Sequence, residues 1–89
     1  MKVIKKDGRT VEFDKTKILT SIENASRDGG DISLNKSDIK IIMDDIINKL
    51  KILRNDGTPT SSYEIIGVIS EVLIKDGFKN VLREFITHE

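Results

Sequence analysis

The sequence predicts a mainly helical α+β domain, in which a four-helix bundle is capped by an N-terminal β-hairpin and a short third strand. Two observations predict this fold. Apolar residues recur at the three- and four-residue spacing of amphipathic helices in four stretches, whereas residues 1–13 alternate around Asp7-Gly8, a strong turn signal. Turn-forming segments at 28–31, 55–59 and 76–77 separate the helical stretches.

The β-hairpin is expected to span residues 2–13. Strands at 3–6 and 9–13 are joined by Asp7-Gly8. A type I′ turn needs a positive φ at both central residues, which glycine adopts freely and aspartate tolerates. Two strands alone are only marginally stable in water, so we expect the hairpin to rest on the remainder of the chain.

Four helices are predicted after the hairpin, at about residues 15–26, 36–54, 62–75 and 78–87. Asp14 is placed to cap the first helix, and Lys17 then lies in its first turn. The second helix is the longest, because its apolar residues keep a period near 3.6 from Ile39 to Leu53.

A short third strand is predicted at Thr60, between the turn at 55–59 and the third helix. Pro59 biases the residue before it toward an extended conformation. Ser61 and Glu64 then fit the capping box, in which a hydroxyl and a carboxylate each bond an orphan backbone N–H. This box marks the start of the third helix.

Length and composition limit the function classes. We expect the 89 residues to form one domain, residues 1–89, with a modest core. The 15 basic and 15 acidic side chains give no net charge, and aromatic residues make up only 4%, which argues against direct nucleic-acid binding. The sequence has no cysteine, which excludes disulfides, thiolate nucleophiles and Cys-ligated zinc, and its single histidine, His88, makes no metal site unaided.

No segment resembles a signal peptide or a transmembrane helix. The N-terminus lacks an apolar run of the required length, and the sequence contains no long uncharged apolar stretch. We therefore expect a cytoplasmic protein that does not enter a membrane.

Cationic side chains gather around the predicted turn. Lys5, Lys6 and Arg9 flank it, and Lys17 joins them from the first helical turn, where the helix N-terminus itself attracts anions. This arrangement is typical of an anion site, which we expect between the hairpin and the helices.

The segments Val3–Arg9 and Phe13–Ile18 resemble the signature of the ATP-cone, the nucleotide-binding regulatory domain at the N-terminus of many ribonucleotide reductases. The family pattern is Val-x-Lys-Arg-Asp-Gly, then Phe-Asp or Phe-Asn, then Lys-Ile. Lys6 stands at the usual arginine, which keeps the charge but loses the bidentate fork. Glu89 stands where an arginine is common. The resemblance extends over nearly the whole chain and implies the same fold of helices under a small sheet.

The resemblance also implies a ligand site. Val3 would border the adenine, and three lysines would face the phosphates, while Asp14 would contact the nucleoside. Glu64 would act through a magnesium ion or only in the capping box. The nucleotide-binding residues implied in this way are Val3, Lys5, Lys6, Asp14, Lys17 and Thr60.

Each of these residues also has a purely structural interpretation. Lysines on a hairpin are usually solvated, and the helix N-cap alone accounts for Asp14. Thr60 is as easily a strand residue as a ligand contact. Asp7-Gly8 is interpreted as a turn and not a calcium loop, because no further oxygen ligands follow at the required spacing. His88 and Tyr63 are assigned no function.

The sequence thus favours a regulatory module that binds ATP or dATP, with magnesium, and is not an enzyme. No catalytic residue and no metal ligand is assigned, because the chain has no Walker-type glycine-rich run and no cysteine for ribonucleotide reduction. The resemblance implies control of a ribonucleotide reductase, or of a regulator of it, through subunit association, including homo-oligomer formation. The alternative is a degenerate cone that no longer binds nucleotide and serves as a protein-interaction or dimerisation module.

Overall fold

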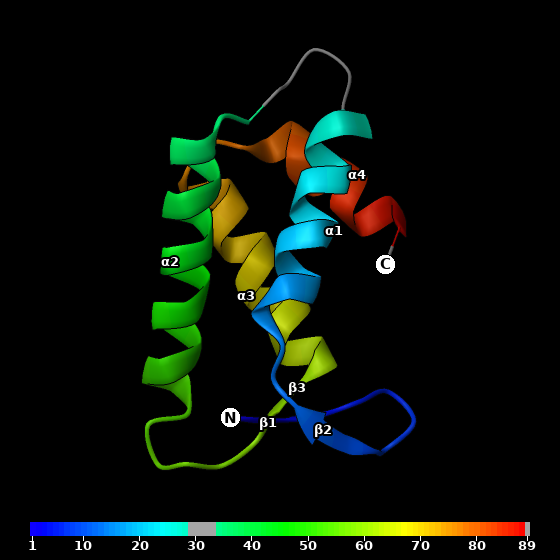
Figure 1. The fold of residues 1–89 in the computed structure, drawn as a ribbon, viewed down its shortest axis with the longest axis vertical. Helices are drawn as coiled ribbons and strands as arrows, with labels where there is room; N and C mark the ends of the chain where they lie inside the picture. Colours follow the sequence, from blue (N-terminus) through cyan, green and yellow to red (C-terminus); the bar gives the residue numbers. More distant parts are fainter. Residues whose placement is uncertain (29–33, 89) are drawn as a thin grey trace.

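The computed structural model describes residues 1–28 and 34–88, and it confirms the predicted fold class (Figure 1). Four helices pack together, and a three-stranded sheet lies at one end of them. In chain order the elements are β1 (Lys2–Ile4), β2 (Thr10–Glu12), α1 (Lys15–Asp28), α2 (Lys36–Leu53), β3 (Thr60–Ser61), α3 (Ser62–Lys75) and α4 (Lys79–His88).

The turn of the hairpin differs from the predicted type I′ turn. Gly8 has a φ of 91°, but no described residue other than glycine has a positive φ, so Asp7 does not take the left-handed conformation. The Gly8 N–H donates to the Lys5 carbonyl at 2.9 Å, and the Lys5 N–H donates to the Arg9 carbonyl at 2.7 Å. This is a three-residue connection, in which only the last residue needs a left-handed φ. The Asp7 carboxylate accepts the Arg9 N–H at 3.0 Å and so helps to close the turn.

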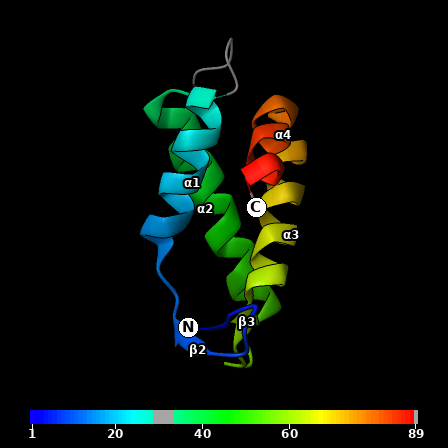
Figure 2. The ribbon, with the colours of Figure 1, turned by 90° about the vertical axis from the view of Figure 1, so that its right-hand side faces the viewer.

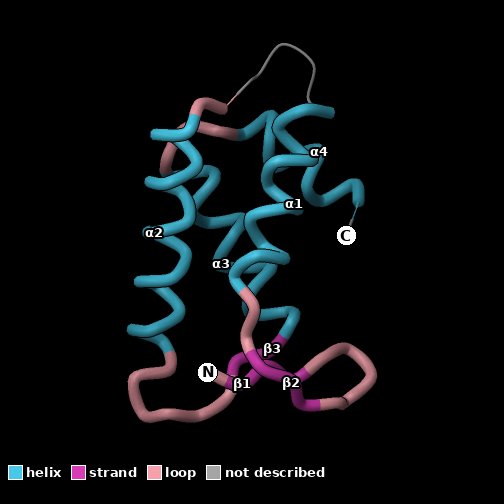
Figure 3. The backbone as a smooth tube through the Cα atoms, in the orientation of Figure 1, coloured by secondary structure: helices cyan, strands magenta, loops and turns pink. Residues whose placement is uncertain are grey.

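Strand β1 is the centre of the sheet, whose order is β2-β1-β3 (Figure 3). It pairs antiparallel with β2 and parallel with β3, so that Val3 lies opposite both Val11 and Thr60. Thr60 is fully buried, and Val3 is 6% exposed. The hairpin therefore rests on the rest of the chain through the predicted third strand.

The first two helices begin with side-chain caps. The Asp14 carboxylate accepts the Thr16 N–H at 3.0 Å, as expected of an N-cap. At α2, Asn35 and Asp38 form a full capping box, with reciprocal bonds of 2.7 and 3.2 Å. Helix α1 continues to Asp28, two residues beyond the predicted end.

Helix α3 has only half of the predicted capping box. The Ser61 hydroxyl accepts the Glu64 N–H at 3.0 Å, so Ser61 is the N-cap. The Glu64 carboxylate does not return this bond, because it accepts hydrogen bonds from Arg54 and Thr60 instead. An arginine and a buried hydroxyl are stronger competitors for a carboxylate than one backbone N–H.

A Schellman turn ends α3 and starts α4. The Phe78 N–H donates to the Leu73 carbonyl at 2.7 Å, and Gly77 takes a φ of 89°. The turn brings the short α4 back against α1 and α3. Figure 2 shows α4 beside the upper part of α3.

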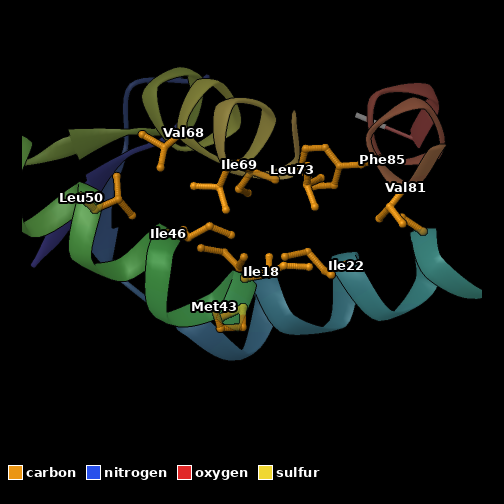
Figure 4. Packing of buried hydrophobic residues seen from close by; sticks show 13 residues of the cluster. Ile18, Ile22, Met43, Ile46, Leu50, Val68, Ile69, Leu73, Val81 and Phe85 are labelled. Carbon is orange, nitrogen blue, oxygen red and sulfur yellow. The ribbon is translucent and has the colours of Figure 1, made fainter. Parts of the chain in front are cut away.

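The core lies between the helices and draws on all four of them (Figure 4). Ile46 of α2 and Leu73 of α3 are fully buried, and Phe85 of α4 is 3% exposed. Bulky aliphatic side chains dominate this cluster, which consists of Ile18, Ile22, Ala25, Ile42, Met43, Ile46, Leu50, Val68, Ile69, Val72, Leu73, Val81 and Phe85.

Asp76, at the C-cap of α3, is a carboxylate in an unfavourable place. Its Oδ2 atom is buried without a hydrogen-bond partner among the described residues. Burial, and then the nearby Asp45 carboxyl, raise the pKa of Asp76. A pKa raised in the folded state means that protonation of Asp76 stabilises the fold at acid pH, and that this contribution is lost as the pH rises through the raised pKa.

Replacing Asp76 by asparagine should therefore stabilise the protein at neutral pH. The amide removes a negative charge from a helix C-terminus, an effect of about 0.3 to 1 kcal/mol. The gain should shrink as the pH falls through the raised pKa of Asp76, where the wild-type carboxyl takes up its proton. Urea unfolding at pH 4, 5.5 and 7 measures this difference. A variant that is less stable than wild type at pH 7 would contradict the interpretation of Asp76 as an unfavourably placed carboxylate.

Candidate functional site

A cavity of about 460 Å³ lies between the hairpin, α1 and α3, and Phe85 of α4 also contributes to its wall. Figure 2 shows how these elements are arranged, with α1 and α3 on either side and the sheet at one end. A cavity of this volume is in the range of small-molecule sites. Its lining residues are Val3, Lys5, Lys6, Asp7, Arg9, Val11, Glu12, Phe13, Asp14, Lys17, Ile18, Ser21, Ser62, Ile65, Ile66, Ile69 and Phe85.

Helix α1 presents one face to the cavity. Lys17, Ile18 and Ser21 line it together with the N-cap Asp14, at the three- and four-residue spacing of a single helical face. The cap sets where the helix begins, so it also sets the rotation that turns Lys17 toward the hairpin.

The hairpin supplies further cationic side chains, on the side of the cavity that faces α1. Val3 of β1 lines the cavity, and so does Lys5, which directly follows the strand. Lys6 follows in the turn, where its ammonium lies 5.8 Å from the centre of the Tyr63 ring. This cation–π contact joins the hairpin to the first turn of α3.

The acidic side chains of the lining are already engaged. Asp7 pairs with Arg9, whose Nε lies 2.7 Å from the Asp7 Oδ2. Glu12 pairs with Lys2 across the hairpin, and this contact lowers the pKa of Glu12. Hydrogen bonds from Thr16 lower the pKa of Asp14, so all three carboxylates are held by partners within the chain.

Unlike these carboxylates, which are held by partners within the chain, the lysines of the lining have no ion-pair partner among the described residues. Within residues 1–28 and 34–88, no carboxylate forms an ion pair with Lys5, Lys6 or Lys17. Three ammonium groups outside any ion pair of the described residues lie around one cavity, beside a helix N-terminus, and such an arrangement favours an anion. The remaining wall is largely apolar, with Ile65 and Ile69 of α3 among its residues, and suits a flat apolar group.

The structure brings five of the six predicted residues to this cavity: Val3, Lys5, Lys6, Asp14 and Lys17. Thr60 lies outside the lining. It is fully buried in β3, and its hydroxyl donates to Glu64 at 2.7 Å. Glu64 also lies outside the lining, so neither residue contacts the cavity in this structure. The roles assigned to the six residues stay predictions.

Sequence reasoning missed two parts of the site. The first is the wall formed by α3, although the helical spacing of Ser62, Ile65, Ile66 and Ile69 was visible in the sequence. The second is Arg54, whose guanidinium holds the Glu64 carboxylate through bonds of 2.8 and 2.6 Å. No sequence signal links these two residues, because the turn at 55–59 brings them together only in the folded chain.

The donor set suits an anion better than a metal ion. Among the described residues, no group of three or more His, Asp or Glu side chains is placed to hold a metal. Magnesium keeps most of its waters and often binds through substrate phosphates with only one or two protein carboxylates. A magnesium ion that arrived on a polyphosphate would therefore need no such group of protein ligands.

Fold and cavity together define a small ligand-binding domain with a cationic site for an anionic molecule. The comparison with family models makes the class specific. The ATP cone domain model matches residues 1–88, and the chain belongs to this family of nucleotide-binding regulatory domains.

A comparison with curated proteins gives no match. Within residues 1–28 and 34–88, no helix combines the length and the apolar character needed to cross a bilayer.

Proposed function

We propose that this chain is a single regulatory domain that binds ATP or dATP, with magnesium, and does not hydrolyse it. The observation that carries the proposal is a set of three lysines, Lys5, Lys6 and Lys17, that surround one cavity of about 460 Å³ and form no ion pair with a described carboxylate. Membership of the ATP-cone family supports the adenine nucleotide as the ligand.

The phosphates bind at the lysines, and the adenine packs on the apolar wall. Ammonium groups from both the hairpin and α1 make charge-assisted hydrogen bonds to phosphate oxygens. Val3 borders the base, and Asp14 accepts a hydrogen bond from the nucleoside while it caps α1. A magnesium ion bound with the nucleotide would be held mainly by the phosphates and would neutralise part of their charge beside the lysines.

The same site lacks the groups that hydrolysis requires. Phosphoryl transfer needs a positioned water, a group that orients it and a firmly held metal. The three carboxylates of the lining already accept hydrogen bonds or ion pairs from Arg9, Lys2 and Thr16, so none is available as a base. The bound nucleotide is therefore a signal and not a substrate.

The signal is transmitted to a protein partner. A regulatory domain acts when a partner surface binds its two loaded states with different affinity. The partner is a ribonucleotide reductase or a regulator of it in the cytoplasm, and the response is a change of subunit association, including association between copies of this chain. Nucleic acid is not a direct partner, because the chain has no net charge.

A second function is favoured by a specific observation. Lys6 replaces the usual arginine and contacts Tyr63, while Thr60 and Glu64 bond to each other away from the cavity. A degenerate cone that has lost nucleotide binding and serves only as an interaction module would show these features.

Isothermal titration separates the two functions. The folded protein in magnesium buffer is titrated with ATP, dATP, GTP and AMP. We expect micromolar binding of ATP or dATP, with clearly weaker binding of GTP and AMP. No heat with any of the four, from a protein with intact helical circular dichroism, would favour the interaction module instead.

A further inference from the structure

We propose that the Arg54–Glu64 pair positions strand β1 for ligand binding, and that it acts through Thr60 without touching the ligand. The inference rests on the proposed function, because it concerns the same cavity. It adds a positioning role for three residues that lie outside the cavity lining.

Glu64 is the centre of the network. Its Oε1 accepts the Thr60 hydroxyl at 2.7 Å and the Arg54 Nε at 2.8 Å, and its Oε2 accepts an Arg54 terminal nitrogen at 2.6 Å. The arginine therefore grips the carboxylate with two parallel bonds, the strongest arrangement for such a pair. Arg54 follows the end of α2 and Glu64 lies in the first turn of α3, so the pair spans the turn that carries β3.

The network is more buried than the other ion pairs of the described chain. The Arg54 and Glu64 side chains are 32% and 24% exposed, whereas every other paired side chain is at least 40% exposed. Thr60 is fully buried, so its hydroxyl has to find an acceptor within the protein. Hydrogen bonds from Arg54 and Thr60 lower the pKa of Glu64, which keeps this acceptor charged at neutral pH.

Thr60 connects the network to the cavity. It lies opposite Val3 in the parallel pair of β1 and β3, and that pair is only two residues long. Val3 of β1 lines the cavity, and Lys5 lines it from the turn that directly follows β1. A slip of one residue between β1 and β3 would turn Val3 away from the cavity and displace the turn that carries Lys5. The bond from Thr60 to Glu64 holds β3 in place and thereby holds Val3, and the start of this turn, at the cavity.

Replacement of Glu64 by alanine tests the role. The start of α3 should survive this change, because the Ser61 hydroxyl accepts the backbone N–H of residue 64. This cap does not depend on the side chain at that position. We expect intact helical circular dichroism and ATP binding about tenfold weaker by isothermal titration. Glu64→Gln keeps an acceptor for Thr60, and we expect it to recover part of the affinity.

The matched control is Glu71→Ala. Glu71 lies two turns further along α3 and pairs with Lys49 of α2 at 2.6 Å, so it joins the same two helices away from the sheet. This variant should bind ATP as wild type does. Wild-type affinity in Glu64→Ala, or an equal loss in both variants, would overturn the positioning role.

Hydrogen exchange distinguishes a failure of this inference from a failure of the proposed function. If the wild-type protein binds no adenine nucleotide, the proposed function fails, whereas the positioning of β1 remains measurable. Glu64→Ala should then speed amide exchange in β1, with α2 exchange unchanged relative to Glu71→Ala. Unchanged exchange in β1 would overturn the positioning role on its own.

Discussion

Replacement of Ile46 by alanine should lower the free energy of unfolding by about 2 to 5 kcal/mol. Ile46 is fully buried between α2 and the other helices of the core. The truncation removes apolar area from the core and leaves a cavity that rigid neighbours fill only in part. Urea unfolding followed by circular dichroism measures the loss.

An exposed isoleucine on the same helix gives the control. Ile52 is 71% exposed, so Ile52→Ala should change stability by no more than about 0.5 kcal/mol. A loss below about 1 kcal/mol in Ile46→Ala, or similar losses in both variants, would mean that α2 buries a different face.

Removal of the cavity lysines should weaken ATP binding by about 1 to 3 kcal/mol. The two test proteins are Lys17→Ala and the double variant Lys5→Ala/Lys6→Ala. These side chains line the cavity and form no ion pair with a described carboxylate, so their loss should remove the proposed phosphate contacts without leaving a carboxylate unpaired. Isothermal titration with ATP gives the affinity, and thermal unfolding shows that the fold persists.

The control is Lys15→Ala. Lys15 begins the same helix as Lys17 but does not line the cavity, so its removal changes the net charge equally. ATP affinity should stay near that of wild type. Equal affinity in the Lys15 and Lys17 variants would leave no role for Lys17 in phosphate binding.

The helical elements were readable from the sequence because their signals are local. The apolar spacing of α2 and the caps at Asp14 and Ser61 depend only on neighbours within one or two turns. The predicted turn type was wrong, although the turn itself was correctly placed at Asp7-Gly8. Asp7-Gly8 favours a two-residue connection, but the hydrogen bonds from Gly8 to Lys5 and from Lys5 to Arg9 give three residues.

The site was predictable only in part. The lysines of the hairpin and of α1 carry a motif, and the fold brings them to one cavity. The destination of the Glu64 carboxylate was not predictable, since it depends on Arg54, which approaches only after α2 and α3 have packed. The capping-box pattern predicted a bond from the Ser61 backbone N–H to the Glu64 carboxylate. In the folded chain, Arg54 takes this carboxylate instead. The departure at Glu89 lies outside the described residues.

The parallel pairing of β1 with β3 has a consequence for the order of folding. Strand β1, which carries Val3, pairs locally with β2 but gains its second partner only when Thr60 has been synthesised, and Phe85 closes part of the cavity later still. Such long-range contacts form slowly, because closing a large loop costs conformational entropy before the contacts can stabilise the chain. A ligand of this pocket selects chains in which the hairpin, α1, α3 and α4 have already come together, and it stabilises that assembled state.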